Sequence, residues 1–95
     1  MENENIWLIA GLGNPGRKYE KTWHNLGFLV LEYLSQDLKI SVNKIKFKGI
    51  YGTGDLDGKK IVMLKPATYM NNSGESLREA ASFYKVPIGN IIVIY

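Results

Sequence analysis

Apolar residues run without interruption in two short stretches near the ends of the chain, residues 6–10 and 91–95. Runs of this length are typical of strands that are covered on both faces, as in the centre of a parallel sheet. The first run leads into a stretch rich in glycine, proline and asparagine. The pattern therefore predicts a buried strand at each end of the chain, the second of them a central strand.

From residue 44 to residue 49, lysines alternate with Ile45, Phe47 and Gly49, and this period of two fades through residues 50–52. Asp57–Gly58 is a turn signal, and residues 60–64 form an apolar run that ends at Lys65–Pro66. Proline cannot donate a ladder hydrogen bond, so we expect the strand to stop there. These features predict an antiparallel hairpin whose solvent side carries three lysines, Lys44, Lys46 and Lys48.

Helical spacing of apolar residues appears twice. The first helix is expected over about residues 25–38 with Asn25 as its N-cap. Its expected apolar stripe consists of Leu26, Val30, Tyr33, Leu34 and Leu38. The second helix is expected to begin with a capping box of Asn72 and Glu75 and to end before Pro87 and Gly89. Its expected stripe consists of Leu77, Ala80, Ala81 and Tyr84.

Strands and helices in this order indicate an α/β fold. At 95 residues with 45% hydrophobic content, the chain is globular and forms at most one domain. Ligand sites in open α/β sheets lie beyond the carboxyl ends of such strands. The last predicted strand ends at residue 95, so we interpret residues 1–95 as one domain that is half of a larger one.

Composition narrows the chemistry. The 12 basic and 9 acidic residues give a net charge of +3, which fits an anionic partner without requiring one. There is no cysteine for disulfides, thiolate chemistry or Cys-based metal sites, and one histidine leaves little for a metal cluster. The polar, acidic first residues do not resemble a signal peptide, and no apolar run is long enough to span a membrane. We therefore expect a cytoplasmic protein.

The glycine-rich stretch begins with Gly11-x-Gly13-x-x-Gly16, which has the letters of the dinucleotide-binding fingerprint. Pro15 and the polar run after it delay the expected helix, and Asp37 falls within a helix instead of ending a second strand. The context therefore argues against nicotinamide or flavin binding. On pattern alone, a tight strand-to-helix turn without a binding function explains the glycines as well as a functional site does.

His24 is the only histidine and lies at the mouth of the first helix. It is either a surface or capping residue, or a general base, because a neutral imidazole titrates near operating pH. A general base needs an orienting carboxylate. Glu20 and Asp37 are candidates by sequence proximity alone, and the partner could also lie outside this chain.

A second polar cluster occupies residues 65–74. In the simplest interpretation it caps the second helix. Asn71 is then spare, and its amide is able to bind a peptide-like group or stabilise an oxyanion.

A non-catalytic RNA-binding module is an alternative. The hairpin lysines are most simply a solvated or edge-protecting strand face, yet they also suit phosphate contacts, and Arg17, Lys18 and Lys21 lie nearer the candidate site. The aromatic contacts of such a module are expected from Trp23, Tyr51 and Tyr69.

Two long motifs in register resemble the bacterial-type peptidyl-tRNA hydrolase family. That family carries GLGNPG, then Y-x-x-T-R-H-N-x-G-F, and later K-P-x-T-[FY]-M-N-x-S-G. The matches are Gly11 to Gly16, Tyr19, Thr22, His24, Asn25, Gly27, Phe28, Lys65, Pro66, Thr68 to Asn71, Ser73 and Gly74. The resemblance spans the whole chain and implies a monomeric α/β fold with a mixed twisted sheet and flanking helices.

The resemblance implies hydrolysis of the ester between a peptide and the 3′ ribose of tRNA. It makes His24 the general base and Asn14 and Asn71 active-site amides that hold the substrate and the attacking water. It also implies contacts to substrate or tRNA, from Tyr19, Tyr69, Met70 and Asn71. Peptidyl-tRNA is the implied partner, with no metal, cofactor or membrane.

The sequence departs from the family in two ways. Trp23 stands where the family has arginine beside the histidine. Family members are also roughly twice as long, and the aspartate that orients the histidine falls just past Tyr95 in the family pattern. A third asparagine and the basic residues that hold the tRNA stem belong to that second half.

Overall fold

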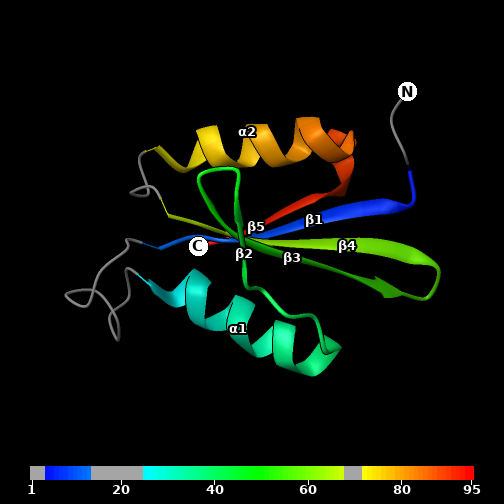
Figure 1. Ribbon diagram of the computed structural model, residues 1–95, viewed down its shortest axis with the longest axis horizontal. Helices are drawn as coiled ribbons and strands as arrows, with labels where there is room; N and C mark the ends of the chain where they lie inside the picture. Colours follow the sequence, from blue (N-terminus) through cyan, green and yellow to red (C-terminus); the bar gives the residue numbers. More distant parts are fainter. Residues whose placement is uncertain (1–3, 14–24, 68–71) are drawn as a thin grey trace.

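The computed structural model describes residues 4–13, 25–67 and 72–95. Five strands form one mixed sheet, with a helix on each of its faces (Figure 1). In chain order the elements are β1 (Ile6–Gly11), α1 (Leu26–Leu38), β2 (Lys44–Lys46), β3 (Gly49–Leu56), β4 (Lys59–Pro66), α2 (Ser73–Tyr84), the short 3-10 helix η4 (Ile88–Asn90) and β5 (Ile91–Ile94). The α/β fold with a mixed sheet and flanking helices is therefore confirmed.

The strand order is β2-β3-β4-β1-β5. Strands β4, β1 and β5 are parallel to one another, whereas β2, β3 and β4 form an antiparallel meander. β1 lies at the middle of the parallel part, and its residues Leu8 and Ala10 are fully buried. The buried strand predicted at the start of the chain is confirmed.

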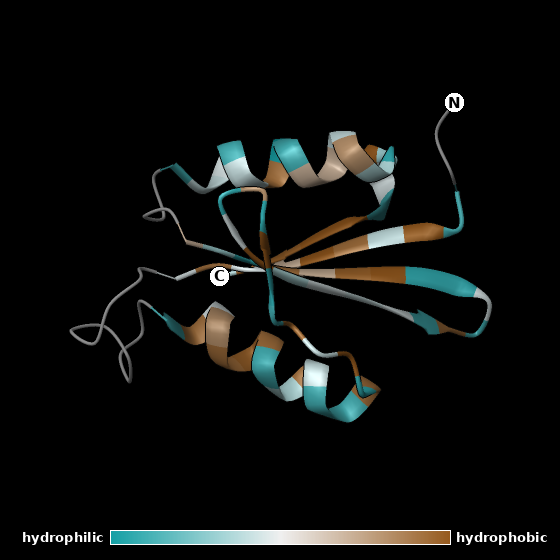
Figure 2. Ribbon diagram, in the orientation of Figure 1, coloured by the Kyte–Doolittle hydropathy of each residue, from teal (hydrophilic) through white to brown (hydrophobic). Residues whose placement is uncertain are grey.

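The sheet separates two hydrophobic clusters. On the α2 face, residues of β1 and β4 pack with Phe47, Ala80 and Val86, and on the α1 face Leu31 and Ile40 pack with Ile61 and Met63. Polar and apolar residues occur together along each helix, as amphipathic helices require (Figure 2). The stripe predicted for α2 is confirmed, because Ala80 is buried and Leu77, Ala81 and Tyr84 pack against the core.

The stripe predicted for α1 is partly wrong. Tyr33 is 71% exposed, and Leu31, which the prediction left out, is fully buried. The helix turns its Gly27 side toward the sheet, so the buried line follows Leu31 and not Tyr33. The predicted N-cap position Asn25 is confirmed, but its side chain makes no capping hydrogen bond.

The continuous strand predicted over residues 44–52 is wrong. Phe47 and Lys48 have φ of 56° and 53°, and this left-handed pair forms a turn between β2 and β3. Lys48 therefore does not share a strand face with Lys44 and Lys46, and Ile45 is 87% exposed. The alternation of lysines with other residues continues through this turn, so it does not mark one continuous strand. The second turn, at Asp57–Gly58 between β3 and β4, is confirmed.

Two further predictions need correction. Asn72 occupies the N-cap position of α2 without a side-chain capping bond, and the Glu75 carboxylate contacts Lys48 instead of closing a capping box. Among the described residues, β5 pairs with β1 alone and lies at the edge of the sheet, so the central position predicted for it is not observed. Its exposed Ile92 shows that the apolar run is not covered on both faces here.

Candidate active site

The carboxyl ends of three neighbouring parallel strands meet at one edge of the sheet. Ala10 of β1 pairs with Leu64 of β4 and with Val93 of β5. Just beyond β1, the Leu12 amide donates to the Ile94 carbonyl at 2.8 Å, which extends the β1–β5 pairing. Both helices also begin at this edge (Figure 1). It is the place where open α/β sheets bind their ligands.

The residues that the family resemblance assigns to the site lie outside the described residues, as do Glu20 and Trp23. The assigned residues are Asn14, Tyr19, His24, Tyr69, Met70 and Asn71. Their described chain neighbours are placed: Gly13 follows β1, Asn25 precedes α1, Ala67 follows β4 and Asn72 precedes α2. We call residues 14–24 the first motif segment and residues 68–71 the second motif segment. Because β1 and β4 are adjacent and parallel, the structure brings the attachment points of these two segments to the same edge.

Backbone contact fixes α1 against this edge. A Cβ on Gly27 would clash with the carbonyls of Leu12 and Ile94 and would lie 2.5 Å from the Leu12 nitrogen. A Cβ on Gly11 would lie 2.7 Å from Leu31 Cβ. Only glycine allows the helix to approach the strand ends so closely. Both glycines belong to the family motif, but the spacing of the motif residues in the sequence did not predict this contact.

Asn25 lies at the base of the first motif segment and is only 6% exposed. A Cβ on Gly13 would lie 2.9 Å from Asn25 Oδ1 and 2.8 Å from Phe28 Cδ2. The Asn25 amide therefore packs against the backbone that leaves β1. From the sequence, Asn25 was expected to cap a helix, and its burial beside Gly13 is an additional feature of the site.

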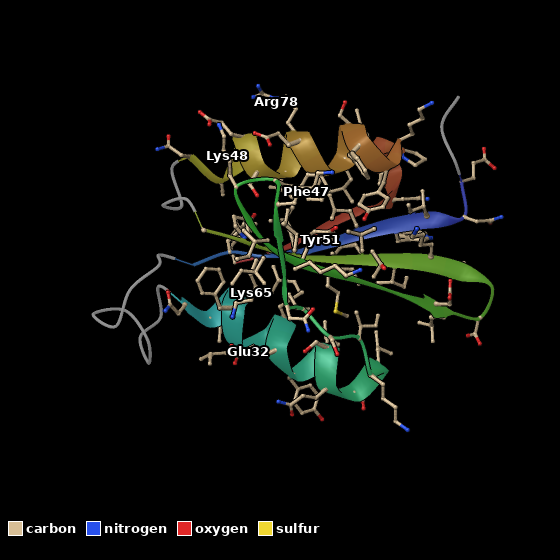
Figure 3. The ribbon with its side chains drawn as sticks, viewed as in Figure 1. Glu32, Phe47, Lys48, Tyr51, Lys65 and Arg78 are labelled. Carbon is tan, nitrogen blue, oxygen red and sulfur yellow. The ribbon has the colours of Figure 1, made fainter. Side chains whose placement is uncertain are left out.

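Lys65, at the end of β4, brings a positive charge to the α1 face of the same edge. Its Nζ lies 2.9 Å from Glu32 Oε1 and 5.1 Å from the centre of the Phe28 ring. The side chain is 21% exposed and links the sheet to α1 (Figure 3). From the sequence, Lys65 was expected to end a strand and it matched the second family motif, but its ion pair with Glu32 was not predicted.

Asp37 is wrong as the orienting carboxylate for a base at this edge. It lies in the last turn of α1, and a rise of 1.5 Å per residue puts that turn roughly 16 Å from the helix start. A side chain next to Asn25 in the chain cannot reach it. Asp37 lies in a helix, as predicted. It therefore cannot be the acidic residue that a dinucleotide-binding site has at the end of its second strand.

Two of the proposed RNA contacts have other roles. Tyr51 is partly buried, with its ring centre 4.9 Å from that of Phe47. Lys48 Nζ lies 2.7 Å from Glu75 Oε2, and this hydrogen bond raises the pKa of Lys48 and lowers the pKa of Glu75. Lys44 and Lys46 remain exposed on β2. The lysines are therefore not one uniform basic face.

Within the described ranges, no three histidine, cysteine or acidic residues gather as a metal site would require. None of the described helices has the length and apolar character needed to cross a membrane.

Comparison with known proteins agrees with the motifs. The sequence model of the family described as peptidyl-tRNA hydrolase matches residues 8–95. A peptidyl-tRNA hydrolase of Thermoanaerobacter sp. (strain X514) is 54% identical over 90 residues, which are 95% of this chain and 49% of that protein. One from Clostridium perfringens (strain 13 / Type A) is 57% identical over 88 residues, 93% of this chain and 47% of its own length.

Solved structures give the same result. The crystal structure of peptidyl-tRNA hydrolase from Acinetobacter baumannii superposes with a TM-score of 0.88 at 40% identity, covering 98% of this chain and 48% of that one. A complex of peptidyl-tRNA hydrolase with N-propanol gives a TM-score of 0.89. The chain thus spans about half the length of the curated relatives that it matches. On its motifs, fold and sequence identity, the chain belongs to the peptidyl-tRNA hydrolase family.

Proposed function

We propose that this chain supplies the general base and two amides of a site that hydrolyses the ester between a peptide and the 3′ ribose of tRNA. One observation carries the proposal. The segments that contain His24 and Asn71 start from adjacent parallel strands, β1 and β4, at the ligand-binding edge of the sheet. In the sequence they are far apart, and only the fold brings their attachment points together.

The roles follow from side-chain chemistry. The His24 imidazole takes a proton from water, which then attacks the ester carbonyl. The amides of Asn14 and Asn71 donate hydrogen bonds to the carbonyl oxygen as negative charge develops on it, and their oxygens orient the water. Tyr19, Tyr69 and Met70 supply the surface for the terminal nucleotide and the peptide. As the ester C–O bond breaks, the His24 imidazolium returns this proton to the 3′ oxygen of the ribose, so the base and the amides account for each step without a metal or cofactor.

The carboxylate that orients His24 is proposed to follow β5, where the family has its aspartate. β5 ends beside β1, as the hydrogen bond from Leu12 to Ile94 shows. A carboxylate there would lie at the same edge as the first motif segment. It would fix the imidazole tautomer and stabilise its charged form. We further propose that residues 1–95 are one part of a single domain, acting as a cytoplasmic monomer on peptidyl-tRNA.

The test is hydrolysis of an N-acetyl-aminoacyl-tRNA by this chain, with His24→Ala alongside. If the chain is active, removal of the base should lower kcat by at least about a hundredfold while the far-UV circular dichroism is unchanged. If the chain is inactive alone, joining it to the second half of the Thermoanaerobacter relative should give activity that His24→Ala abolishes. Normal turnover of the variant in either form would contradict the assigned base.

The RNA-binding alternative makes a different prediction. It expects tRNA binding that weakens steeply with salt and does not respond to His24→Ala. The packing of Tyr51 and the ion pair of Lys48 remove two of its contacts, so the hydrolase is the better-supported proposal.

A further inference from the structure

The turn between β2 and β3 uses an unusual pair of residues. Tight turns with positive φ at both central positions favour Asn-Gly, because other side chains are disfavoured there. Here the pair is Phe47 and Lys48. Backbone conformations of this kind persist where the surroundings hold them in place. The contacts that this turn makes are therefore expected to stabilise its left-handed backbone conformation.

Both side chains of the turn are directed to α2. Phe47 is 5% exposed and packs against Tyr84 and Phe83, with ring centres 5.9 Å and 5.3 Å away. Lys48 Nζ lies 2.7 Å from Glu75 Oε2 and 3.5 Å from Glu79 Oε2 (Figure 3). The turn is thus attached to α2 by an apolar anchor and by ion pairs.

The two carbonyl groups of the turn hold different elements. The Phe47 carbonyl accepts a hydrogen bond from the buried Ser76 hydroxyl in the first turns of α2. The Lys48 carbonyl accepts one from the Ala67 amide, just after β4, at 2.9 Å. Consecutive peptide units of one turn therefore connect the end of β4 to the beginning of α2.

The next residue presses the turn onto β4. Gly49 pairs with Pro66, and a Cβ on Gly49 would lie 2.6 Å from the Lys65 carbonyl oxygen. The turn consequently has little freedom to move relative to the end of β4. Only residues 68–71 separate Ala67 from Asn72, and they include Tyr69, Met70 and Asn71.

We propose that Phe47, Lys48 and Ser76 are positioning residues, which set the spacing between the end of β4 and the start of α2, the two attachment points of the segment that contains Asn71. This inference rests on the proposed function for the role of Asn71. The turn holds Ala67 and the first turn of α2 through two consecutive backbone carbonyls, so a change in the turn shifts one attachment point relative to the other. None of the three residues needs to touch the substrate.

The first experiment uses the chain by itself and requires no activity. Ser76→Ala removes the donor to the Phe47 carbonyl. Ser35→Ala is the matched control, because it removes an exposed hydroxyl that donates to the Glu32 carbonyl within α1, on the opposite face of the sheet. Hydrogen exchange of the Ala67 amide should accelerate at least about tenfold in Ser76→Ala, relative to the core amide of Leu8. The Asn71 side-chain amide resonances should shift in that variant and not in Ser35→Ala. Unchanged exchange and resonances in Ser76→Ala would overturn the proposal.

A second pair of variants leaves the core untouched. Lys48→Met removes the ion pairs with Glu75 and Glu79, and Lys48→Arg retains them. The Asn71 resonances should shift in Lys48→Met and return toward the wild-type positions in Lys48→Arg. Equal spectra for the two variants would show that the charge of Lys48 plays no positioning part.

Failure of the proposed function gives a different result. We would titrate each variant with a 3′-amide analogue of N-acetyl-aminoacyl-adenosine, which resembles the substrate but is not hydrolysed. Under the proposal, its affinity falls at least about threefold in Ser76→Ala and is unchanged in Ser35→Ala. If the variant spectra change as expected but the analogue does not perturb Asn71 even in the wild type, the positioning stands and the function assigned to this edge is wrong.

Discussion

The two helices start from the same edge of the sheet but are held there in different ways. α1 lies against the ends of β1 and β5 through backbone contacts at Gly27, with no side chain between them. α2 is held by the Phe47–Lys48 turn, which is inserted from a distant part of the chain. The start of α1 therefore depends on the absence of a side chain, and the start of α2 depends on particular side chains elsewhere.

This difference has consequences for the two motif segments. The first motif segment leads into α1, and the position of α1 depends on Gly27, which belongs to the same motif. The second returns to a helix whose position is set by residues outside any quoted motif. Substitutions far from the site in sequence should thus affect the second segment more than the first.

The largest effect is expected from removal of the anchor of α2. Phe47→Ala should lower the free energy of unfolding by about 3–5 kcal/mol, because it leaves a cavity between Tyr51, Phe83 and Tyr84. Urea denaturation followed by circular dichroism measures the change. A loss below about 1 kcal/mol would mean that the turn is not the main attachment of α2.

Gly27→Ala should break the attachment of α1. The added methyl group meets backbone atoms of Leu12 and Ile94 that cannot move aside, so a loss of at least about 2 kcal/mol is expected in the same assay. Gly74→Ala is the matched control, since its Cβ would have no neighbour within 4 Å. There alanine should leave stability unchanged or raise it by up to about 1 kcal/mol. Similar effects at both positions would refute the close approach of α1.

The smallest effect is a loosening of α2 at high pH. Burial, followed by the hydrogen bond with Tyr51, raises the pKa of Tyr84 to about 12 from 10.0. Folding therefore favours the neutral phenol, and this stabilisation is complete below pH 10 and is lost as the pH rises toward 12. The pKa of Lys48 is also raised, so the wild type must be compared with Tyr84→Phe. The difference in unfolding free energy between them should shrink from pH 9 to 12, and a constant difference would contradict the shift.

The sequence predicted the elements that follow from local pattern. β1, β4 and both helices were expected near their observed bounds, because apolar runs and helical spacing are properties of contiguous residues. A central position was predicted for β5 and is not observed among the described residues, since an apolar run shows that a strand prefers burial but not how many neighbours it has. The Phe47–Lys48 turn was missed because its left-handed pair carries no glycine or asparagine.

For the site, the motifs indicated which side chains react, and the structure showed the strands and helices from which their segments start. The motifs named His24, Asn14 and Asn71 as the reacting groups, and these assignments remain predictions. The structure added Lys65, Asn25 and the turn, whose contacts join residues far apart in the chain and so leave no mark in local spacing. It removed Asp37, which is near His24 in sequence but at the far end of α1.

The position of β1 between β4 and β5 also has a consequence for synthesis. Leu8 pairs with Val62 of β4 and with Ile91 of β5, yet it is made before either strand. At a translation rate of about 5–20 residues per second, Leu8 waits several seconds for its last partner. During that time the buried strand β1 is without the neighbours that cover its backbone hydrogen-bonding groups. The pairing of β1 is therefore complete only after β4 and β5 have been made.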